Sequence, residues 1–384
     1  MKIKWHSRLP SVLICVSKGL DRAKAKVAAF DLDSTLITTK SGKTFASNSD
    51  DWKWWHTNIP ERLMDLYSQG YKIVIFSNQN GLNSEKRIRD FKIKLDTILG
   101  QLSMPVLLYA AMKKDQYRKP MTGMWEDMIK EYKDDDVTID LKQSFYVGDA
   151  AGRLDGWKHK MKRDHSCADR KFAHNIGIKF YTPEVFFHNE KEVDFSWGDF
   201  NPHSYSMAIP LFTPTCSPLI PQSHDDSKEM IIFVGSPASG KSSFAKKHLI
   251  PHGYEYINQD TLKTKAKCLK ACEEAIQQNK SVVIDNTNGT SDVRAEYLNL
   301  ARKHDLPARC FYFVADEHLC RHNNYYRHIR QKESRDLLSE IVFRTYKSRF
   351  QEPTLDEGFA EIKKINFVFE GDDDDLMAWR KWYL

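Results

Sequence analysis

The sequence contains no long apolar run. No stretch of this 384-residue chain approaches the roughly 18 apolar residues of a membrane-spanning helix, so we expect neither a transmembrane span nor a membrane partner. The longest apolar stretch near the start, Val12 to Val16, is also too short for the core of a secretory signal.

Cysteine is scarce, and its spacing is not that of a metal site. The chain has seven cysteines, an odd number, and no Cys-x-x-Cys pair. Cys268 and Cys272 are spaced to share one face of a helix, which does not fit a zinc ribbon. The pattern is typical of a protein in a reducing intracellular compartment.

A strong excess of either charge is also absent. The formal net charge is +6 and the pI is 8.7, which suits a polyanionic partner. The pI still lies below the value of about 9 that indicates nucleic-acid binding by itself. With 41% hydrophobic and 12% aromatic residues, the chain can form ordinary globular cores, and its length favours two domains.

The clearest boundary is rich in proline. Five of the fourteen prolines lie between Pro202 and Pro221, where the apolar periodicity lapses. Such segments resist helix formation and are typical of linkers. We therefore predict an N-terminal extension, a first domain, a linker and a second domain, with the bounds 1–26, 27–190, 191–227 and 228–384.

Strands and helices alternate in both halves, which predicts two α/β domains, each with a doubly wound parallel sheet. The expected strands are 27–30, 71–76, 106–110 and 144–147 in the first half, and 230–234, 254–258, 281–284 and 309–314 in the second. In the first half, Asp31, Ser77 and Asp149 fall at strand ends. Ligands of such sheets bind there, so we expect these side chains to share a site.

Two carboxylates follow the first strand, in Asp31-Leu-Asp33-Ser-Thr. Asp31 can attack phosphorus and form an aspartyl-phosphate, and Asp33 can protonate the leaving oxygen and then activate water. The residues expected to bind the phosphate are Ser77, Asn78 and Lys119. The residues expected to bind Mg²⁺ in this half through hard oxygens are Asp31, Asp33 and Asp149.

The second half contains a P-loop, Gly235-x-x-x-x-Gly240-Lys241-Ser242, between a strand and a helix. The loop amides can surround the phosphates of ATP, Lys241 can reach the β- and γ-phosphates, and the Ser242 hydroxyl can bind Mg²⁺. The predicted nucleotide-binding residues are Gly235, Ser236, Ala238, Ser239, Gly240, Lys241, Ser242 and Ser243.

Two later aspartates each allow two interpretations. Asp260 can accept the proton of an attacking hydroxyl, or it can cap the helix that follows. Asp285 can be a Walker-B carboxylate near Mg²⁺, or a turn residue in Asp-Asn-Thr-Asn. A basic helix that starts near Asp316 includes Arg321 and can bring an arginine to the transferring phosphate, although such helices are more often solvated faces.

Aromatic and basic clusters lie close to the first site in the sequence. Trp52, Trp54 and Trp55 lie in a short insertion after the first strand, where they can stack bases or pack on the domain. The basic stretch Trp157-Lys-His-Lys-Met-Lys-Arg163 follows Asp149, so we favour a place on the rim of the cleft over a localisation or nucleic-acid patch.

Together these motifs resemble the animal polynucleotide kinase 3′-phosphatases, with a first half similar to the haloacid dehalogenase superfamily. The resemblance covers about residues 27–369. It includes Phe-Asp-Leu-Asp-Ser-Thr-Leu, Ile-Phe-Ser-Asn-Gln, Tyr-Arg-Lys-Pro, Val-Gly-Asp-Ala-Ala-Gly-Arg, Ser-Cys-Ala-Asp169-Arg, the P-loop, Asn-x-Asp260-Thr-Leu, Ile-Asp285-Asn-Thr-Asn and Arg321-His-Asn-Asn.

The resemblance implies a Mg²⁺-dependent 3′-phosphatase and an ATP-dependent 5′-hydroxyl kinase. Asp31 is then the nucleophile, Asp33 the acid/base and Asp149 a metal ligand. In the kinase half, Lys241 and Ser242 bind ATP and Mg²⁺, Asp260 is the general base and Arg321 stabilises the transferring phosphate.

Three departures from the family pattern stand out. Ser34 lies where glycine is usual, and Gln259 lies where mammalian members have arginine, a difference that bears on one expected phosphate or DNA contact and not on the general base Asp260. Only about 26 residues precede the expected first strand. We therefore expect no forkhead-associated domain and no docking of phosphorylated partners through one.

These observations predict a monomeric enzyme that processes 3′-phosphate and 5′-hydroxyl DNA ends, single- or double-stranded, in the nucleus and in the mitochondrion as a second compartment. One alternative is a small-metabolite kinase fused to a small-molecule phosphatase. The short insertion after Asp33 argues against it, because a large cap normally encloses a small substrate. A binding scaffold with inactive sites is a third hypothesis, and the presence of every residue that the chemistry needs argues against it.

Overall fold

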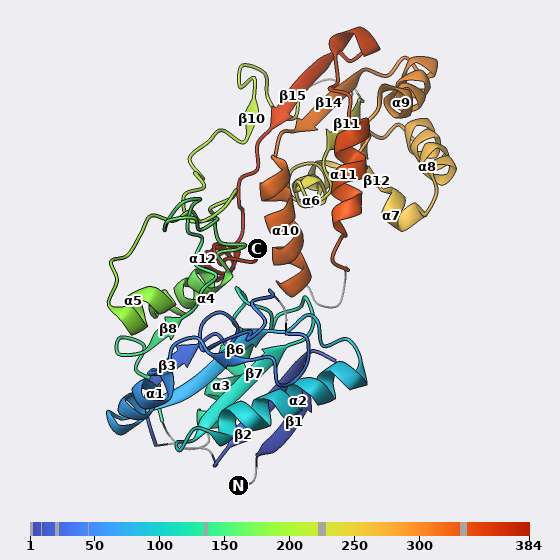
Figure 1. Ribbon diagram of the computed structural model, residues 1–384. Helices are drawn as coiled ribbons and strands as arrows, with labels where there is room; N and C mark the ends of the chain where they lie inside the picture. Colours follow the sequence, from blue (N-terminus) through green and yellow to red (C-terminus); the bar gives the residue numbers. More distant parts are fainter. Residues whose placement is uncertain are drawn as a thin grey trace. The chain divides into compact units, whose positions relative to one another are not determined.

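The computed structural model describes residues 3–8, 10–19, 23–44, 46–133, 137–221, 228–330 and 336–384. The chain divides into two compact units, Met1–Asn201 with Lys381–Leu384, and Pro202–Arg380. Each unit has its own mostly parallel sheet with helices on both faces (Figure 1), which confirms the predicted α/β class. The last four residues belong to the first unit, whereas the sequence analysis assigned them to the second domain.

The sheet of the first unit has the strand order β1-β2-β7-β6-β3-β8-β9. The strands are Lys4–Arg8 (β1), Val12–Ser17 (β2), Lys26–Phe30 (β3), Tyr71–Asn78 (β6), Val106–Ala111 (β7), Phe145–Val147 (β8) and Lys179–Tyr181 (β9). The five neighbouring strands β7, β6, β3, β8 and β9 are parallel. β2 runs antiparallel to β7, and β1 runs antiparallel to β2. β1 and β2 lie in residues that the sequence analysis treated as an extension.

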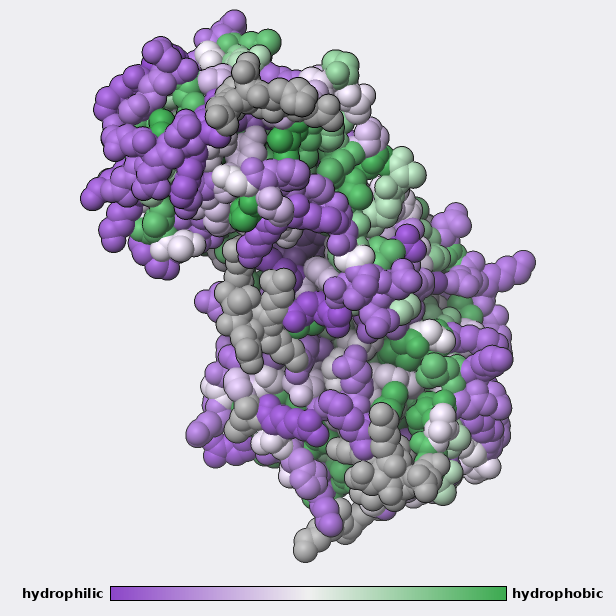
Figure 2. Space-filling model, turned by 180° about the vertical axis from the view of Figure 1, so that it is seen from behind, coloured by the Kyte–Doolittle hydropathy of each residue, from purple (hydrophilic) through white to green (hydrophobic). Residues whose placement is uncertain are grey.

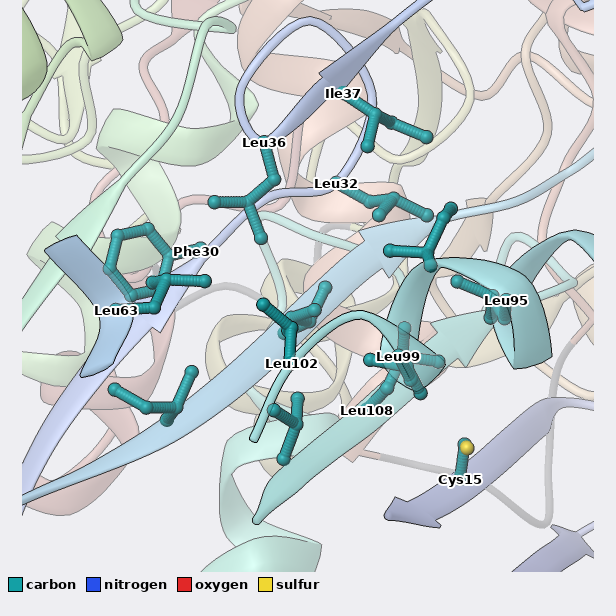
Figure 3. Close-up of a cluster of buried hydrophobic side chains, with 14 of the residues drawn as sticks. Cys15, Phe30, Leu32, Leu36, Ile37, Leu63, Leu95, Leu99, Leu102 and Leu108 are labelled. Atoms are coloured by element: carbon teal, nitrogen blue, oxygen red, sulfur yellow. The ribbon is translucent and has the colours of Figure 1, made fainter. Parts of the chain in front are cut away.

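Helices cover both faces of this sheet. One apolar core joins the strands to α1 (Ile59–Ser68) and α2 (Glu85–Gly100). Figure 3 shows this core, in which Phe30 and Leu108 of the strands lie with Leu63 of α1 and Leu95 and Leu99 of α2. A second core joins the opposite face to α3 (Gly123–Lys133) and α4 (Ala168–Ile176). The small hairpin of β4 (Ile37–Thr38) and β5 (Lys53–Trp54) and the helix α5 (Pro183–His188) complete the unit.

The sheet of the second unit has the order β10-β15-β14-β11-β13-β12. The strands are Phe212–Thr213 (β10), Met230–Gly235 (β11), Glu255–Ile257 (β12), Val282–Ile284 (β13), Ala308–Phe313 (β14) and Glu361–Ile365 (β15). All neighbours are parallel except β10 and β15. The four strands expected in this half are present within two residues of their predicted ends.

Helices also flank the second sheet on both faces. One core packs against α8 (Lys265–Gln277) and α9 (Ser291–Lys303), and the other packs against α6 (Lys241–His248). The remaining helical segments are Ile250–His252 (η1), Gln259–Leu262 (α7), Glu317–Arg330 (α10), Glu340–Arg349 (α11), Leu355–Glu357 (η2) and Asp373–Trp379 (α12).

Much of the segment predicted as a linker is packed. Phe195 forms a bridge with Arg153 in the first unit. In the second unit, β10 pairs with β15, and Arg309 Nη2 donates to the Leu219 carbonyl at 2.9 Å. The last six residues of the predicted linker, 222–227, lie outside the described part of the chain.

Among the described residues, none of the helices combines the length and apolar character needed to cross a membrane. Figure 2 shows one face of the molecule, on which hydrophilic side chains cover more of the surface than hydrophobic ones.

Candidate active sites

Three strands of the first sheet bring the predicted side chains to one edge. β3 lies between β6 and β8, and successive strands are added on opposite sides of it, so the strand order reverses at this point. Asp31 follows β3, Ser77 lies at the end of β6, and Asp149 follows β8. The edge where ligands bind in such sheets therefore carries all three.

A buried ion-pair cluster lies at this edge. Lys119 Nζ is 2.6 Å from Asp31 Oδ1 and 2.7 Å from Asp169 Oδ1. It also donates to the Tyr146 hydroxyl at 2.8 Å. Burial by itself lowers the pKa of Lys119, but the charges of Asp169 and Asp31 raise it overall. The ammonium thus stays protonated in a site that is closed to bulk water.

The acidic side chains of this cluster fit a divalent metal. Asp31, Asp149 and Asp169 offer carboxylate oxygens that all lie within 4.8 Å of one another. Burial raises the pKa of Asp31 to about 7, and burial with the charges of Asp31 and Asp169 raises the pKa of Asp149 well above its usual range. Three carboxylates beside one ammonium leave excess negative charge, which a hard cation would offset. This group contains Asp169 where the sequence analysis expected Asp33.

Asp169 is the site residue that sequence reasoning left without a role. It lies in the first turn of α4, and its Oδ2 accepts a hydrogen bond from the Ala150 amide at 3.0 Å. A β-carbon at Gly148 would lie 2.4 Å from the same oxygen, so glycine permits this close approach. Its sequence signal was its place in Ser-Cys-Ala-Asp-Arg, a phrase that carries no chemistry until the fold brings it to the strand ends.

The Asp33 side chain has different surroundings from that of Asp31. It is 52% exposed, against 10% for Asp31. Gln79 Nε2 donates to Asp33 Oδ2 at 2.6 Å and to Ser77 Oγ at 2.9 Å. The Lys94 ammonium lies 3.4 Å from Asp33 Oδ1. An exposed, anchored carboxylate beside a buried one suits a division into acid/base and nucleophile. Gln79 and Lys94 were not among the predicted residues.

The side chain of Asn78 binds the backbone of Lys119. Its Oδ1 accepts from the Lys119 amide at 2.9 Å, and its Nδ2 donates to the Lys119 carbonyl at 3.1 Å. Asn78 therefore holds the segment that carries the lysine. Direct phosphate binding by Asn78, Ser77 and Lys119 stays a prediction.

The backbone at Ser34 explains why glycine is usual there. Ser34 has a φ of 60°, in the left-handed region. A β-carbon in that region costs roughly 1–2 kcal/mol. The serine is accommodated with strain, beside the carboxylate of Asp33.

In the second unit, the P-loop joins β11 to α6. Lys241 is buried, and its Nζ donates to the carbonyls of Gly235 at 2.9 Å and Ser236 at 2.7 Å. Burial lowers the pKa of Lys241 to about 8, against the opposing charge of Asp285. Gly240 has a φ of 96°, which favours glycine at the start of the helix.

Ser242 and Asp285 meet beside this loop. Ser242 Oγ donates to Asp285 Oδ2 at 2.5 Å, and the Tyr256 hydroxyl donates to the same oxygen at 2.5 Å. Asn258 Nδ2 donates to the Asp285 carbonyl at 2.7 Å. A buried carboxylate against the P-loop serine favours the Walker-B interpretation of Asp285 over the turn interpretation.

The structure excludes the capping interpretation of Asp260. The N-cap of α7 is Asn258, whose side chain accepts from the Thr261 amide at 3.2 Å. Asp260 is exposed in the first turn of α7. Burial lowers the pKa of Lys241, and the charge of Asp260 raises it. The two side chains therefore share one electrostatic environment. The role of general base stays a prediction.

Arg321 is engaged by two carboxylates. One of its guanidinium nitrogens lies 2.6 Å from Glu317 and 2.8 Å from Glu340. Burial is the main cause that lowers the pKa of Lys241, and the charge of Arg327 lowers it further. A role for Arg321 at the transferring phosphate therefore requires its two ion pairs to open.

Comparison with known proteins gives the same division into two halves. A family model described as polynucleotide kinase 3 phosphatase matches residues 26–187, and one described as AAA domain matches residues 230–271 and 263–353. The bifunctional polynucleotide phosphatase/kinase of Schizosaccharomyces pombe is 42% identical over 384 residues, which cover 100% of this chain and 89% of that protein. The chain belongs to the bifunctional polynucleotide phosphatase/kinase family.

Two further relatives support this membership. A protein of Acanthamoeba polyphaga mimivirus, named as a putative bifunctional polynucleotide phosphatase/kinase, is 35% identical over 384 residues. The match covers 94% of this chain and 89% of the viral protein. The polynucleotide 3′-phosphatase of Arabidopsis thaliana is 37% identical over 199 residues, 48% of this chain and 27% of that protein. The chain thus has a phosphatase domain and a kinase domain, which imply use of a nucleotide and a divalent metal.

In this phosphatase/kinase the three tryptophans of the insertion pack on the domain. Trp52 is buried, and its ring lies 5.6 Å from that of Trp54. Trp54 Nε1 donates to Gln101 Oε1 at 2.9 Å, and the Trp55 ring lies 6.1 Å from Phe187. The packing interpretation therefore accounts for them.

The basic stretch forms a loop beside the phosphatase site. Arg153 Nε lies 2.8 Å from Asp164 Oδ2, and this ion pair closes the loop 154–163 at its base. Arg153 also donates from Nη2 to the Asp149 carbonyl at 3.1 Å. The exposed basic residues of the loop are Lys158, Lys160, Lys162 and Arg163. The base of the loop is thus tied to the strand end that carries Asp149, and its place on the rim of a cleft stays a prediction.

Proposed function

We propose that this protein removes 3′-phosphates from DNA ends and phosphorylates 5′-hydroxyl DNA ends with ATP. The observation that carries the proposal is that one chain holds two side-chain clusters suited to phosphoryl transfer, the Asp31–Lys119–Asp169 cluster and the P-loop with Asp285. The names of the relatives supply the polynucleotide. The exposed lysines of the loop 154–163 suit a phosphodiester backbone.

In the first site, the Asp31 carboxylate attacks the phosphorus of the 3′-phosphate and forms an aspartyl-phosphate. Asp33 protonates the departing 3′-oxygen, and then takes a proton from the water that releases inorganic phosphate and regenerates Asp31. Lys119, held 2.6 Å from Asp31, offsets the charge of the phosphate. Mg²⁺, bound by Asp31, Asp149 and Asp169, would supply further positive charge beside the phosphate oxygens.

In the second site, Asp260 accepts the proton of the 5′-hydroxyl. The hydroxyl oxygen attacks the γ-phosphate of ATP, and ADP leaves. Lys241 offsets charge on the β- and γ-phosphates. In this structure its ammonium donates to loop carbonyls, and the phosphates take the place of these carbonyls when ATP binds. Ser242 and Asp285 would hold Mg²⁺ for the nucleotide.

Binding of DNA is expected to be electrostatic and independent of base sequence, because the exposed groups beside the site are lysines and arginine rather than a base-reading element. The enzyme is proposed to act as a monomer. Its proposed location is the nucleus, with the mitochondrion as a second compartment, since both hold DNA.

The test is a pair of steady-state assays on the full chain with DNA and RNA oligonucleotides that end in 3′-phosphate or 5′-hydroxyl. Nucleosides and sugar phosphates serve as the competing substrate class. The proposal expects oligonucleotide ends to be processed with far higher kcat/KM than the small metabolites. Preference for the small substrates would overturn it in favour of the metabolite kinase/phosphatase alternative, which family membership does not favour.

A further inference from the structure

The last four residues of the chain, Lys381–Leu384, form a C-terminal tail that packs in the first unit. Figure 1 marks the C-terminus beside α4. Asn175 of α4 binds the backbone of Trp382 twice. Its Oδ1 accepts from the Trp382 amide at 2.8 Å, and its Nδ2 donates to the Trp382 carbonyl at 2.9 Å. Lys171, one turn earlier on α4, donates to the Leu384 carbonyl at 2.5 Å.

The Trp382 side chain fixes this tail in place. It is buried, and its ring stacks on Trp197 with centroids 4.8 Å apart and an interplanar angle of 15°. Its Nε1 donates to His174 Nδ1 at 3.3 Å, and the Lys171 ammonium lies 4.8 Å from the ring centroid. A buried aromatic ring with these contacts anchors a short segment that has no secondary structure of its own.

Asn175 also reaches the loop that carries Lys119. Its Nδ2 donates to the carbonyl of Pro120, the next residue, at 2.8 Å. The backbone N–H of Trp382 donates to Oδ1 of Asn175. The side-chain amide of Asn175 is therefore oriented with Nδ2 toward Pro120. On the other side, Asn78 binds the backbone of Lys119. The catalytic lysine is therefore held through its backbone by two asparagines, one of which depends on the tail.

We infer that the C-terminal tail is a positioning element of the phosphatase site. Trp382 orients Asn175, and Asn175 holds Pro120 and with it the backbone that presents Lys119 to Asp31. The tail acts through Asn175 and is not itself catalytic. The inference rests on the proposed phosphatase function, and it adds that this function requires residues that follow the whole kinase unit in the sequence.

The test compares the full chain with a variant that ends at Arg380 and therefore keeps α12. Both are assayed with saturating 3′-phosphate and 5′-hydroxyl oligonucleotides. Phosphatase kcat should fall about tenfold, because a lysine that is less firmly placed stabilises the transition state less well. Kinase kcat and the KM for ATP should stay within twofold. Lys381→Ala, which changes an exposed side chain of the same tail, is the matched control and should leave both activities unchanged.

Asn175→Ala provides a second variant that keeps the chain length. It should lower phosphatase kcat to the same extent, and truncation in the Asn175→Ala background should lower it no further, since both changes break one contact path. Multiplicative losses, or a truncated chain with full phosphatase activity, would overturn the inference. So would a parallel fall of both activities and of the melting temperature, which would make the tail a general stability element. An inactive full-length chain would instead refute the proposed function.

Discussion

At the scale of single residues, the surroundings of Asp31 and Asp33 separate two carboxylates that are one residue apart. The Asp31 side chain is nearly closed to solvent and faces Lys119, whereas that of Asp33 is half exposed and held by Gln79 and Lys94. A nucleophile benefits from a dry, charge-balanced site, and an acid/base needs access to the leaving group and to water. The difference in exposure therefore supports the proposed division of roles between Asp31 and Asp33.

Asp31→Asn should abolish the phosphatase selectively. We expect 3′-phosphatase turnover to fall about a thousandfold or more, because an amide does not attack phosphorus to form the covalent intermediate. Kinase turnover should be unchanged. The measurement is steady-state turnover on a 3′-phosphate oligonucleotide, with mass spectrometry to exclude deamidation back to aspartate. Wild-type turnover in such a sample would remove Asp31 from the mechanism.

Ser34→Gly should stabilise the first unit. Glycine relieves the strain of a β-carbon at a φ of 60°, but it loses more backbone entropy on folding. The net gain in the free energy of unfolding is expected to be about 0.5–1 kcal/mol. Denaturant unfolding of the full chain, read at the transition of the first unit, measures it.

Ser34→Ala is the control for this change, because alanine keeps the β-carbon and should give no gain. Equal stability of the glycine and alanine variants would show that the backbone at this position is not strained.

At the scale of elements, α12 supports the P-loop through α10. The buried Trp379 of α12 donates from Nε1 to Asn323 Oδ1 at 2.7 Å, and Asn323 Nδ2 donates to the Ala238 carbonyl at 3.2 Å. The Trp379 ring also stacks on Phe367, whose ring would lie 3.4 Å from a β-carbon at Gly240. Contacts from a helix near the end of the chain thus brace the P-loop.

Trp379→Phe should weaken ATP binding. The phenylalanine keeps an aromatic ring but removes the hydrogen bond that orients Asn323. We expect the KM for ATP to rise about fivefold with phosphatase kinetics unchanged, since one buried hydrogen bond contributes about 1 kcal/mol. Initial rates at varied ATP concentration give this value.

His322→Phe is the control for α12 packing. His322 Nε2 contacts the Trp379 carbonyl at 2.7 Å, so the variant loosens α12 without touching the Asn323 contact. An equal rise of the KM for ATP in both variants would contradict a specific role for the indole.

At the scale of the whole molecule, each set of proposed catalytic residues lies within one unit. Asp31, Asp33 and Lys119 belong to the first, and Lys241 and Asp285 belong to the second. The units differ in what they require from the rest of the chain, because the first also includes the C-terminal tail. The two chemical steps should nevertheless proceed separately.

Lys241→Ala and Asp33→Asn should each remove one activity. Lys241→Ala should lower kinase turnover about a hundredfold or more, because it removes positive charge from the β- and γ-phosphates, and should keep phosphatase turnover within a few-fold. Asp33→Asn should do the reverse, since it removes the leaving-group acid. Both activities are measured on both variants with saturating oligonucleotide. Collapse of both turnovers in either variant, with unchanged melting, would contradict separate sites.

Local chemistry made much of the fold and of both sites predictable. Most expected strands are apolar runs, and runs such as 71–76 and 230–234 match the observed strands within two residues. Asp31, Ser77 and the P-loop follow such strands directly, so position along the chain was enough to bring them to a ligand-binding edge. Their residue types then indicated phosphoryl transfer.

Contacts between distant segments decided the rest. Asp169 joins the metal-binding group only because α4 packs against the sheet and Gly148 leaves room for its carboxylate. The β1–β2 hairpin and the tail residue Trp382 become parts of the first unit through partners far away in the sequence. A strand end has a local signature, whereas the burial of Asp31, Asp169 or Trp382 depends on which surfaces meet. Residue types and their order along the chain thus indicate phosphoryl-transfer chemistry. The way in which each proposed catalytic group is held depends on the packing of distant segments, because it requires neighbours that the chain order does not reveal.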